Sequence, residues 1–144
     1  MKKLILLFAV FVSATISAQE NKTSPEQSQM YLNQGMDKAN AGDWTSAIND
    51  YNQALIQDPK NAAAYYNRAI ARFNVKDFRG AYMDCSKAIN AGTPTGADCV
   101  GPAYYERGQC LIQMGQKDKA CMDFVKSSDL GDSDGTTAVQ SYCN

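Results

Sequence analysis

The most constraining feature of this 144-residue sequence is a pattern of residue types that recurs at a fixed spacing. Tyr31 recurs as Tyr65 and again as Tyr104, and the second step is longer than the first, so a short insertion separates the last two copies. A unit of this length cannot bury its apolar face alone, whereas stacked neighbouring units share one continuous core. The recurring positions are Tyr31, Gly35, Trp44, Ala47, Asp50, Tyr51 and Ala54, then Tyr65, Ala69, Phe78, Ala81, Asp84, Cys85 and Ala88, then Tyr104, Gly108, Lys117, Ala120, Asp123, Phe124 and Ser127.

Each copy divides into two amphipathic helical patterns separated by a breaker. In the first copy, Ser24 and Pro25 predict a helix start, and a second helix follows the N-cap Asp43. The same order recurs in the later copies, and a short amphipathic segment near the C-terminus is expected to cover the last open face. The predicted helices are 25–40, 44–57, 62–74, 78–91, 102–114, 117–129 and 136–142.

Small residues recur where the two helices of a copy face each other. We expect them to let the helices approach closely, while large side chains fill the space beside them. The small pairs are Gly35 with Ala47, Ala69 with Ala81 and Gly108 with Ala120, and the large neighbours are Trp44, Tyr51, Phe78 and Phe124.

Segment 1–18 has the pattern of an export signal. Lys2 and Lys3 precede an unbroken apolar run at 4–12, and small residues lead up to Ala18. This run is shorter than the roughly 20 apolar residues that a membrane span needs. We therefore expect cleavage after Ala18, a polar segment at 19–27, and export to the periplasm or the extracellular space without a stable membrane anchor.

The composition excludes several classes of function. The sequence has no histidine, which excludes a Ser-His-Asp triad and every zinc site that uses imidazole. A net charge of −1 offers no basic surface for nucleic acid. The segment 129–135 has part of a calcium-loop pattern, but Leu130 stands at a ligand position, so we expect a turn there. We predict no catalytic residue, no metal and no cofactor.

Five cysteines in an exported chain indicate disulfides, with at least one thiol left over. Equal distances from the connecting turn favour a pair between Cys121 and Cys143, which would fasten the C-terminal segment to the third copy and stabilise it by about 3 kcal/mol. Two alternative pairs remain open, and both use Cys110, which lies in the predicted helix 102–114. They are Cys85–Cys110 and Cys99–Cys110.

These features resemble the tetratricopeptide repeat (TPR) family, whose repeat is about 34 residues long. Tyr31, Gly35, Trp44, Ala47 and the terminal Pro59 of the first copy stand at the positions that the family's pattern specifies. The third copy departs most, because a lysine stands where an aromatic residue is usual. On this resemblance the chain is identified as an exported bacterial TPR protein. The implied fold is all-α, with three TPR helix-turn-helix repeats at 28–61, 62–100 (with the loop insertion) and 101–130 that form a short right-handed superhelix, and a C-terminal capping helix within 131–144.

The resemblance also implies a concave groove, lined by the first helix of each repeat, that holds an extended peptide or a helix of a partner protein. Some members grip a carboxylate there with Lys, Asn and Arg. Here only Asn67 matches, Leu32 and Met36 replace polar residues, and Glu106 reverses the charge. A peptide with apolar anchors is therefore the expected ligand. The groove positions are Leu32, Met36, Tyr66, Asn67, Ile70, Phe73, Tyr105, Glu106, Gln109 and Ile112.

The function that this sequence favours is a non-catalytic scaffold for protein–protein interaction. Tyr66 and Tyr105 are candidate contact residues, whereas Tyr65 and Tyr104 are expected to pack inside the repeats. The groove has two other candidate occupants, the residues before Ser28 and a second copy of the chain, which would form a structural homo-oligomer. A carbohydrate-binding module of the cell envelope is a further alternative.

Overall fold

The computed structural model describes residues 24–93 and 96–143, and the predicted export signal lies outside them. Every element in the described part of the chain is helical. The bounds agree closely with the sequence prediction, except that α5 starts two residues earlier and α7 three residues earlier than expected. The helices are α1 (Pro25–Asn40), α2 (Trp44–Gln57), α3 (Ala62–Asn74), α4 (Phe78–Gly92), α5 (Val100–Gln113), α6 (Lys117–Asp129) and α7 (Ser133–Tyr142).

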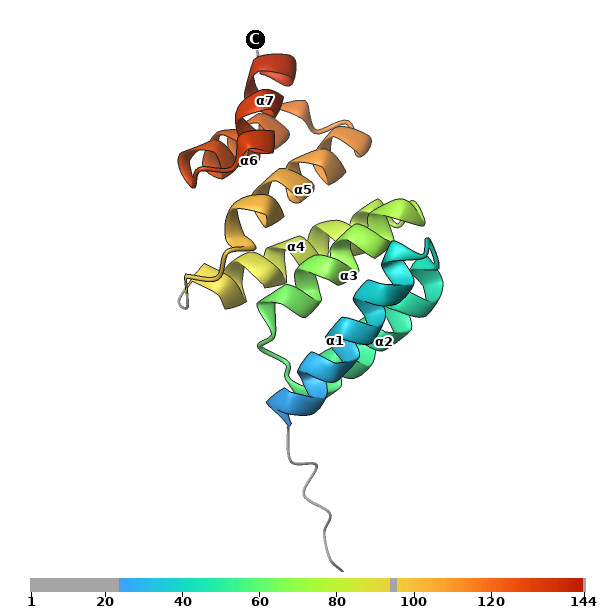
Figure 1. The fold of residues 1–144 in the computed structure, drawn as a ribbon. Coiled ribbons are helices and arrows are strands. Elements are labelled where there is room, and N and C mark those ends of the chain that lie inside the picture. Colours follow the sequence, from blue (N-terminus) through green and yellow to red (C-terminus); the bar gives the residue numbers. More distant parts are fainter. Residues whose placement is uncertain (1–23, 94–95, 144) are drawn as a thin grey trace, which may run out of the picture.

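The helices form three antiparallel pairs stacked in chain order. Helix α1 packs on α2, α3 on α4 and α5 on α6, and each pair contacts the next through α2 with α3 and α4 with α5. Figure 1 shows these pairs following one another along the stack, with α7 at the C-terminal end. Helix α7 packs on α6 and also touches α5, so it covers the face that a fourth pair would cover. This is the predicted all-α architecture with a capping helix.

Short polar side chains set the helix starts. Ser24, Asp43 and Asn61 each accept a hydrogen bond from the backbone N–H three residues further on, and Asp77 does the same for α4. Asp132 accepts from the N–H of the residue at 135, and this cap starts α7 earlier than the hydrophobic pattern alone predicted.

A left-handed residue follows the first helix of each pair. Gly42 has a φ of +81° and Gly115 a φ of +72°, whereas Lys76 takes the same place in the middle pair with a φ of +66°. Glycine adopts this conformation without steric cost, but a residue with a Cβ is destabilised there by about 1–2 kcal/mol. The middle repeat therefore carries a local strain that the other two repeats lack at this position.

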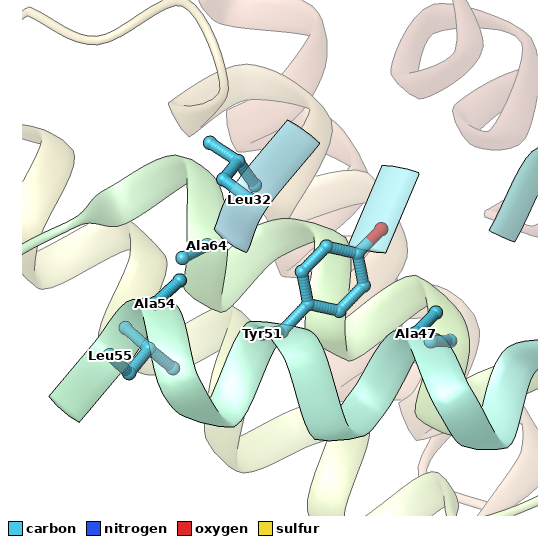
Figure 2. Close-up of a cluster of buried hydrophobic side chains, with 7 residues drawn as sticks. Leu32, Ala47, Tyr51, Ala54, Leu55 and Ala64 are labelled. Atoms are coloured by element: carbon cyan, nitrogen blue, oxygen red, sulfur yellow. The ribbon is translucent and has the colours of Figure 1, made fainter. Parts of the chain in front are cut away.

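Within the first pair, Gly35 lies against the ring of Tyr51. A Cβ added at residue 35 would lie 2.5 Å from the ring atom Cε1, well inside van der Waals contact. Tyr51 is 1% exposed and packs with Leu32, Ala47 and Ala54 in one buried cluster (Figure 2). The predicted role of the small residues is thus confirmed in the first pair.

The other two pairs vary this contact in a correlated way. Gly108 faces the ring of Phe124 and leaves as little space as Gly35 does. In the middle pair, Ala69 replaces the glycine and Cys85 replaces the ring, and both are fully buried in one cluster. The larger residue on α3 is matched by a smaller one on α4, as close packing of the contact requires.

Two buried arginine–aspartate pairs recur in the second and third repeats. The guanidinium of Arg68 donates to both carboxylate oxygens of Asp84, at 2.7 and 2.8 Å, and to Asn52 Oδ1 at 2.6 Å on the preceding repeat. Arg107 repeats this arrangement with both oxygens of Asp123, at 2.7 Å each, and this contact raises the pKa of its guanidinium. The recurrence of the aspartates was predicted, but the arginines that pair with them were not.

The capping helix is fastened by a disulfide. Cys121 on α6 is bonded to Cys143, with a Cα–Cα distance of 5.5 Å, and this is the pair that the sequence favoured. Cys85, Cys99 and Cys110 are free, so neither alternative pair is formed. Within the described residues, no helix is long and apolar enough to cross a membrane.

Candidate functional site

The predicted groove residues all lie on the first helices of the three pairs. Helix α1 carries two of them, and α3 and α5 carry four each. Helix α3 contacts both α1 and α5, so the three helices form one continuous face that Figure 1 shows running along the stack. This surface is called the α1–α3–α5 face below. Its residues are Met36, Tyr66, Asn67, Ile70, Phe73, Tyr105, Glu106, Gln109 and Ile112, all partly or fully exposed.

Leu32 does not belong to this face, and its prediction as a groove residue is wrong. Only 4% of Leu32 is exposed, and it packs in the buried cluster with Tyr51 and Ala64. Figure 2 shows Leu32 beside Ala64, which lies on α3. Tyr66 and Tyr105 stand at the same repeat position but have longer side chains, and both remain partly exposed. A leucine at this position is too short to extend beyond the contact between α1 and α3.

The apolar residues of the face are anchored in the core beneath. The ring of Phe73 packs edge-on against Phe78 at a centroid distance of 5.1 Å. Tyr105 lies 5.9 Å from Phe124, and its hydroxyl accepts a hydrogen bond from Gln109 Nε2 at 2.8 Å. These side chains therefore offer a preformed apolar and aromatic surface, which lowers the entropy lost when a ligand binds.

The polar residues of the face are Asn67, Glu106 and Gln109. Burial raises the pKa of Glu106 to about 6. Burial and then the charge of Glu106 raise the pKa of the Tyr66 phenol to about 12, so this phenol lies within reach of the Glu106 charge. Asn67 donates to the carbonyl of Ala63 on its own helix at 2.8 Å, so part of its hydrogen-bonding capacity is already used.

The face continues onto α7, which sequence reasoning treated only as a cap. A pocket of about 240 Å³ lies between α5 and α7. The sequence could have indicated this extension. Helix α7 follows the third pair in the place of a first helix of a fourth pair, and it exposes small polar residues there. The pocket is lined by Tyr105, Gln109, Asp134, Thr137, Ala138, Ser141 and Tyr142.

The calcium-like segment is a capping turn. Asp132 accepts hydrogen bonds from the hydroxyl of Ser127 and from the backbone of Gly135. The described residues contain no cluster of three or more Cys, Asp or Glu side chains that would hold a metal ion.

Comparison with known proteins identifies the repeats. A family model described as "TPR repeat" matches residues 39–75, and one described as "Tetratricopeptide repeat" matches residues 101–130. Human tetratricopeptide repeat protein 36 is 34% identical over 106 residues, covering 74% of this chain and 56% of that protein. Stress-induced-phosphoprotein 1 of Caenorhabditis elegans is 36% identical over 66 residues, covering 46% of this chain and 21% of that protein. The chain thus spans about half the length of the first of these relatives.

Solved structures share the fold along most of the chain. The first TPR of Spaghetti (RPAP3), bound to the HSP90 peptide SRMEEVD, superposes with a TM-score of 0.77 at 22% identity, covering 84% of this chain and 94% of that one. The N-terminal domain of stress-induced protein-1 from C. elegans gives a TM-score of 0.74 at 24% identity, covering 83% and 97%. At these identities the likeness concerns the fold. The two segments matched by family models and the relatives together show that the repeats of this chain belong to the tetratricopeptide repeat family.

Proposed function

We propose that this protein is a non-catalytic scaffold that binds an extended peptide segment of a partner protein on its α1–α3–α5 face. The observation that carries the proposal is the continuous surface of partly exposed aromatic and apolar side chains on the first helix of each repeat. An exposed apolar surface of this kind marks an interaction site. The structural relative bound to an HSP90 peptide supports a peptide as the ligand.

The chemistry of the face favours apolar anchors over a carboxylate. The peptide SRMEEVD on the structural relative carries three acidic side chains. Here Met36 and the tyrosines at 66 and 105 occupy the face, and the charged residue among those that define it is Glu106. Arg68 and Arg107 lie on the same helices, but their guanidinium groups are bonded to buried aspartates. An acidic peptide would therefore meet repulsion at Glu106.

A random dodecapeptide library tests this proposal. The protein is expected to select peptides with two or more large apolar residues. Met36→Glu, which places a charge on a residue that is 41% exposed, should weaken their binding at least tenfold, and so should the double change of Tyr66 and Tyr105 to Ala. Met122→Ala is the matched control, because Met122 is 73% exposed on α6 and lies off the face. Equal loss in all three variants, or no selected peptide, would overturn the proposal.

A second copy of the chain is the competing occupant of the face. Light scattering across a range of concentrations separates the two cases, because a self-associating protein would show a mass that rises with concentration and falls with Met36→Glu. A monomer at all concentrations leaves the face free for a partner.

We also propose that the protein is exported after cleavage behind Ala18. The pattern of segment 1–18 supports this, and so does the Cys121–Cys143 disulfide, since disulfides persist in oxidising compartments. Sequencing the N-terminus of the protein recovered from its host should find Gln19 first, and an intact Met1 in the cytoplasm would contradict export.

A further inference from the structure

The pocket between α5 and α7 is framed by two tyrosine rings that share one buried support. Tyr105 on α5 and Tyr142 on α7 both pack against Phe124, at ring-centroid distances of 5.9 and 5.7 Å, and both line the pocket. Phe124 is fully buried, so it holds both rings in place. The disulfide between Cys121 and Cys143 fastens the end of α7 that carries Tyr142. The two aromatic walls are therefore formed before a ligand arrives.

The polar side chains of the pocket, apart from the two phenols, offer mainly hydrogen-bond acceptors. Gln109 uses its Nε2 to donate to the Tyr105 hydroxyl at 2.8 Å, and its Oε1 has no hydrogen bond among the described residues. The hydroxyls of Thr137 and Ser141 donate to carbonyls of their own helix at 3.0 and 2.9 Å, so their lone pairs are left for a ligand. These groups suit a ligand that donates several hydrogen bonds.

Asp134 supplies the charge among the residues that line the pocket. It is exposed in the first turn of α7, and no described residue forms an ion pair or a hydrogen bond with its carboxylate. Asp134, Thr137 and Ser141 stand three and four residues apart, so they lie on one face of α7. A ligand in the pocket thus meets a negative charge, acceptor oxygens and two aromatic rings.

An arginine side chain matches this combination of walls. Its guanidinium group is always charged, stacks on aromatic rings and carries N–H donors around its plane. A carboxylate in the same place would be repelled by Asp134, and a purely apolar side chain would leave the acceptor oxygens unpaired. Lysine supplies the charge, but it has fewer donors and no plane that can lie on a ring.

We propose that the pocket between α5 and α7 binds an arginine side chain of the peptide that lies on the α1–α3–α5 face. This inference rests on the proposed peptide-binding function and adds the chemical class of one anchor. Tyr105 and Gln109 line the pocket and also belong to the face, so one peptide can occupy both without a break. Asp134 receives the guanidinium group at the α7 end of the face, and this contact fixes the register of the peptide.

A double-mutant cycle with the tightest peptide from the dodecapeptide library tests the inference. The selected peptides should be enriched in arginine at one position relative to their apolar residues. Replacing that arginine with citrulline, which keeps the shape and removes the charge, should weaken binding about tenfold. Asp134→Asn should weaken binding of the arginine peptide by a similar factor, and the citrulline change should then have little further effect.

Asp118→Asn is the matched control for the loss of one charge. Asp118 stands exposed in the first turn of α6, as Asp134 does in the first turn of α7, and it lies outside the pocket. This change should leave the affinity unaltered. Asp134→Lys should reject the arginine peptide and regain affinity for a peptide with Glu at the same position, a result that loss of the fold does not give. Circular dichroism compares the helical content of every variant.

The outcomes separate this inference from the proposed function. Additive effects in the cycle, no preference for arginine, or an equal loss for Asp118→Asn would overturn the role of the pocket and leave peptide binding on the face standing. Failure of every peptide to bind would overturn both.

Discussion

Gly35 on α1 lies directly against the ring of Tyr51 on α2, and the equivalent residues of the middle repeat are Ala69 and Cys85. The close approach of the two helices thus depends on both side chains together, because a larger one on the first helix requires a smaller one on the second. In the first repeat the ring takes all the space and glycine is required. In the middle repeat the thiol frees enough space for one methyl group.

Gly35→Ala should therefore destabilise the protein although alanine favours helices. Overpacking of this kind destabilises a protein by about 1–3 kcal/mol. This is more than the stability gained because alanine has a higher helix propensity than glycine. Tyr51→Cys alone should cost about 3 kcal/mol because it leaves a cavity. The double variant reproduces the contact of the middle repeat, so its loss in urea unfolding should be smaller than the sum of the single losses. Strict additivity would contradict this account of the contact.

The buried ion pairs predict an asymmetry between repeats. Asp84 is bonded to Arg68 and also to Arg72 at 2.8 Å, whereas Arg107 is the partner of Asp123 within the described residues. Removing the partner of a buried charge costs about 3–5 kcal/mol. Arg107→Met should approach this loss, and Arg68→Met should lose less because Arg72 remains. Thermal unfolding of both variants measures the difference, and a larger loss for Arg68→Met would contradict it.

The cysteines should differ sharply in reactivity. Cys85 is fully buried, and its hydrogen bond with Cys110 and its burial raise the pKa of its thiol far above the usual range. Cys99 is partly exposed in the loop before α5, although burial raises its pKa as well. In native protein, iodoacetamide should modify Cys99 first and Cys85 only after unfolding. Non-reducing peptide mapping should find Cys121 linked to Cys143, and free thiols at both would contradict the fastened cap.

The Glu106 carboxyl predicts a pH effect on stability. Its pKa is about 6 in the folded protein against 4.5 for the exposed group, so the folded state binds more protons between these values. The contribution of this carboxyl to the free energy of unfolding is therefore fully present below pH 4.5. It falls by about 1–2 kcal/mol as the pH rises through 6.

Glu106→Gln removes the carboxyl and with it this fall in the free energy of unfolding at higher pH. The variant should be more stable than the parent at pH 7.5 and gain less at pH 4.5, while Asp129→Asn serves as the control. An equal difference between Glu106→Gln and the parent at both values would show that the carboxyl is not destabilised by burial.

Local signals in the sequence predicted most of the fold. Asp43 and Asp77 are good N-caps, so the starts of α2 and α4 were predicted at the right residues. The repeat pattern placed Gly35 where the two helices of a pair approach closely and Tyr51 in the space beside it, because the pattern fixes which helices pair. The early start of α7 was missed, because segment 129–135 was expected to be a turn and Asp132 within it was not recognised as the N-cap of a helix.

Features that depend on contacts between repeats were harder to predict. Arg68 and Arg107 recur at the same spacing as Asp84 and Asp123, so the signal existed, but a charged residue on a helix is usually solvated and gave no reason to expect a buried pair. Leu32 shares its repeat position with Tyr66, and only the packing of α1 against α3 shows that the shorter side chain is covered.

The central claim is that the first helices of the repeats form the ligand surface. Backbone amide chemical shifts, recorded by NMR as the selected dodecapeptide is added to the full protein, test it most directly. We expect the largest changes on α1, α3 and α5, including Met36, Tyr66, Tyr105 and Glu106, with an extension to α7. Changes confined to α2, α4 and α6 would contradict it.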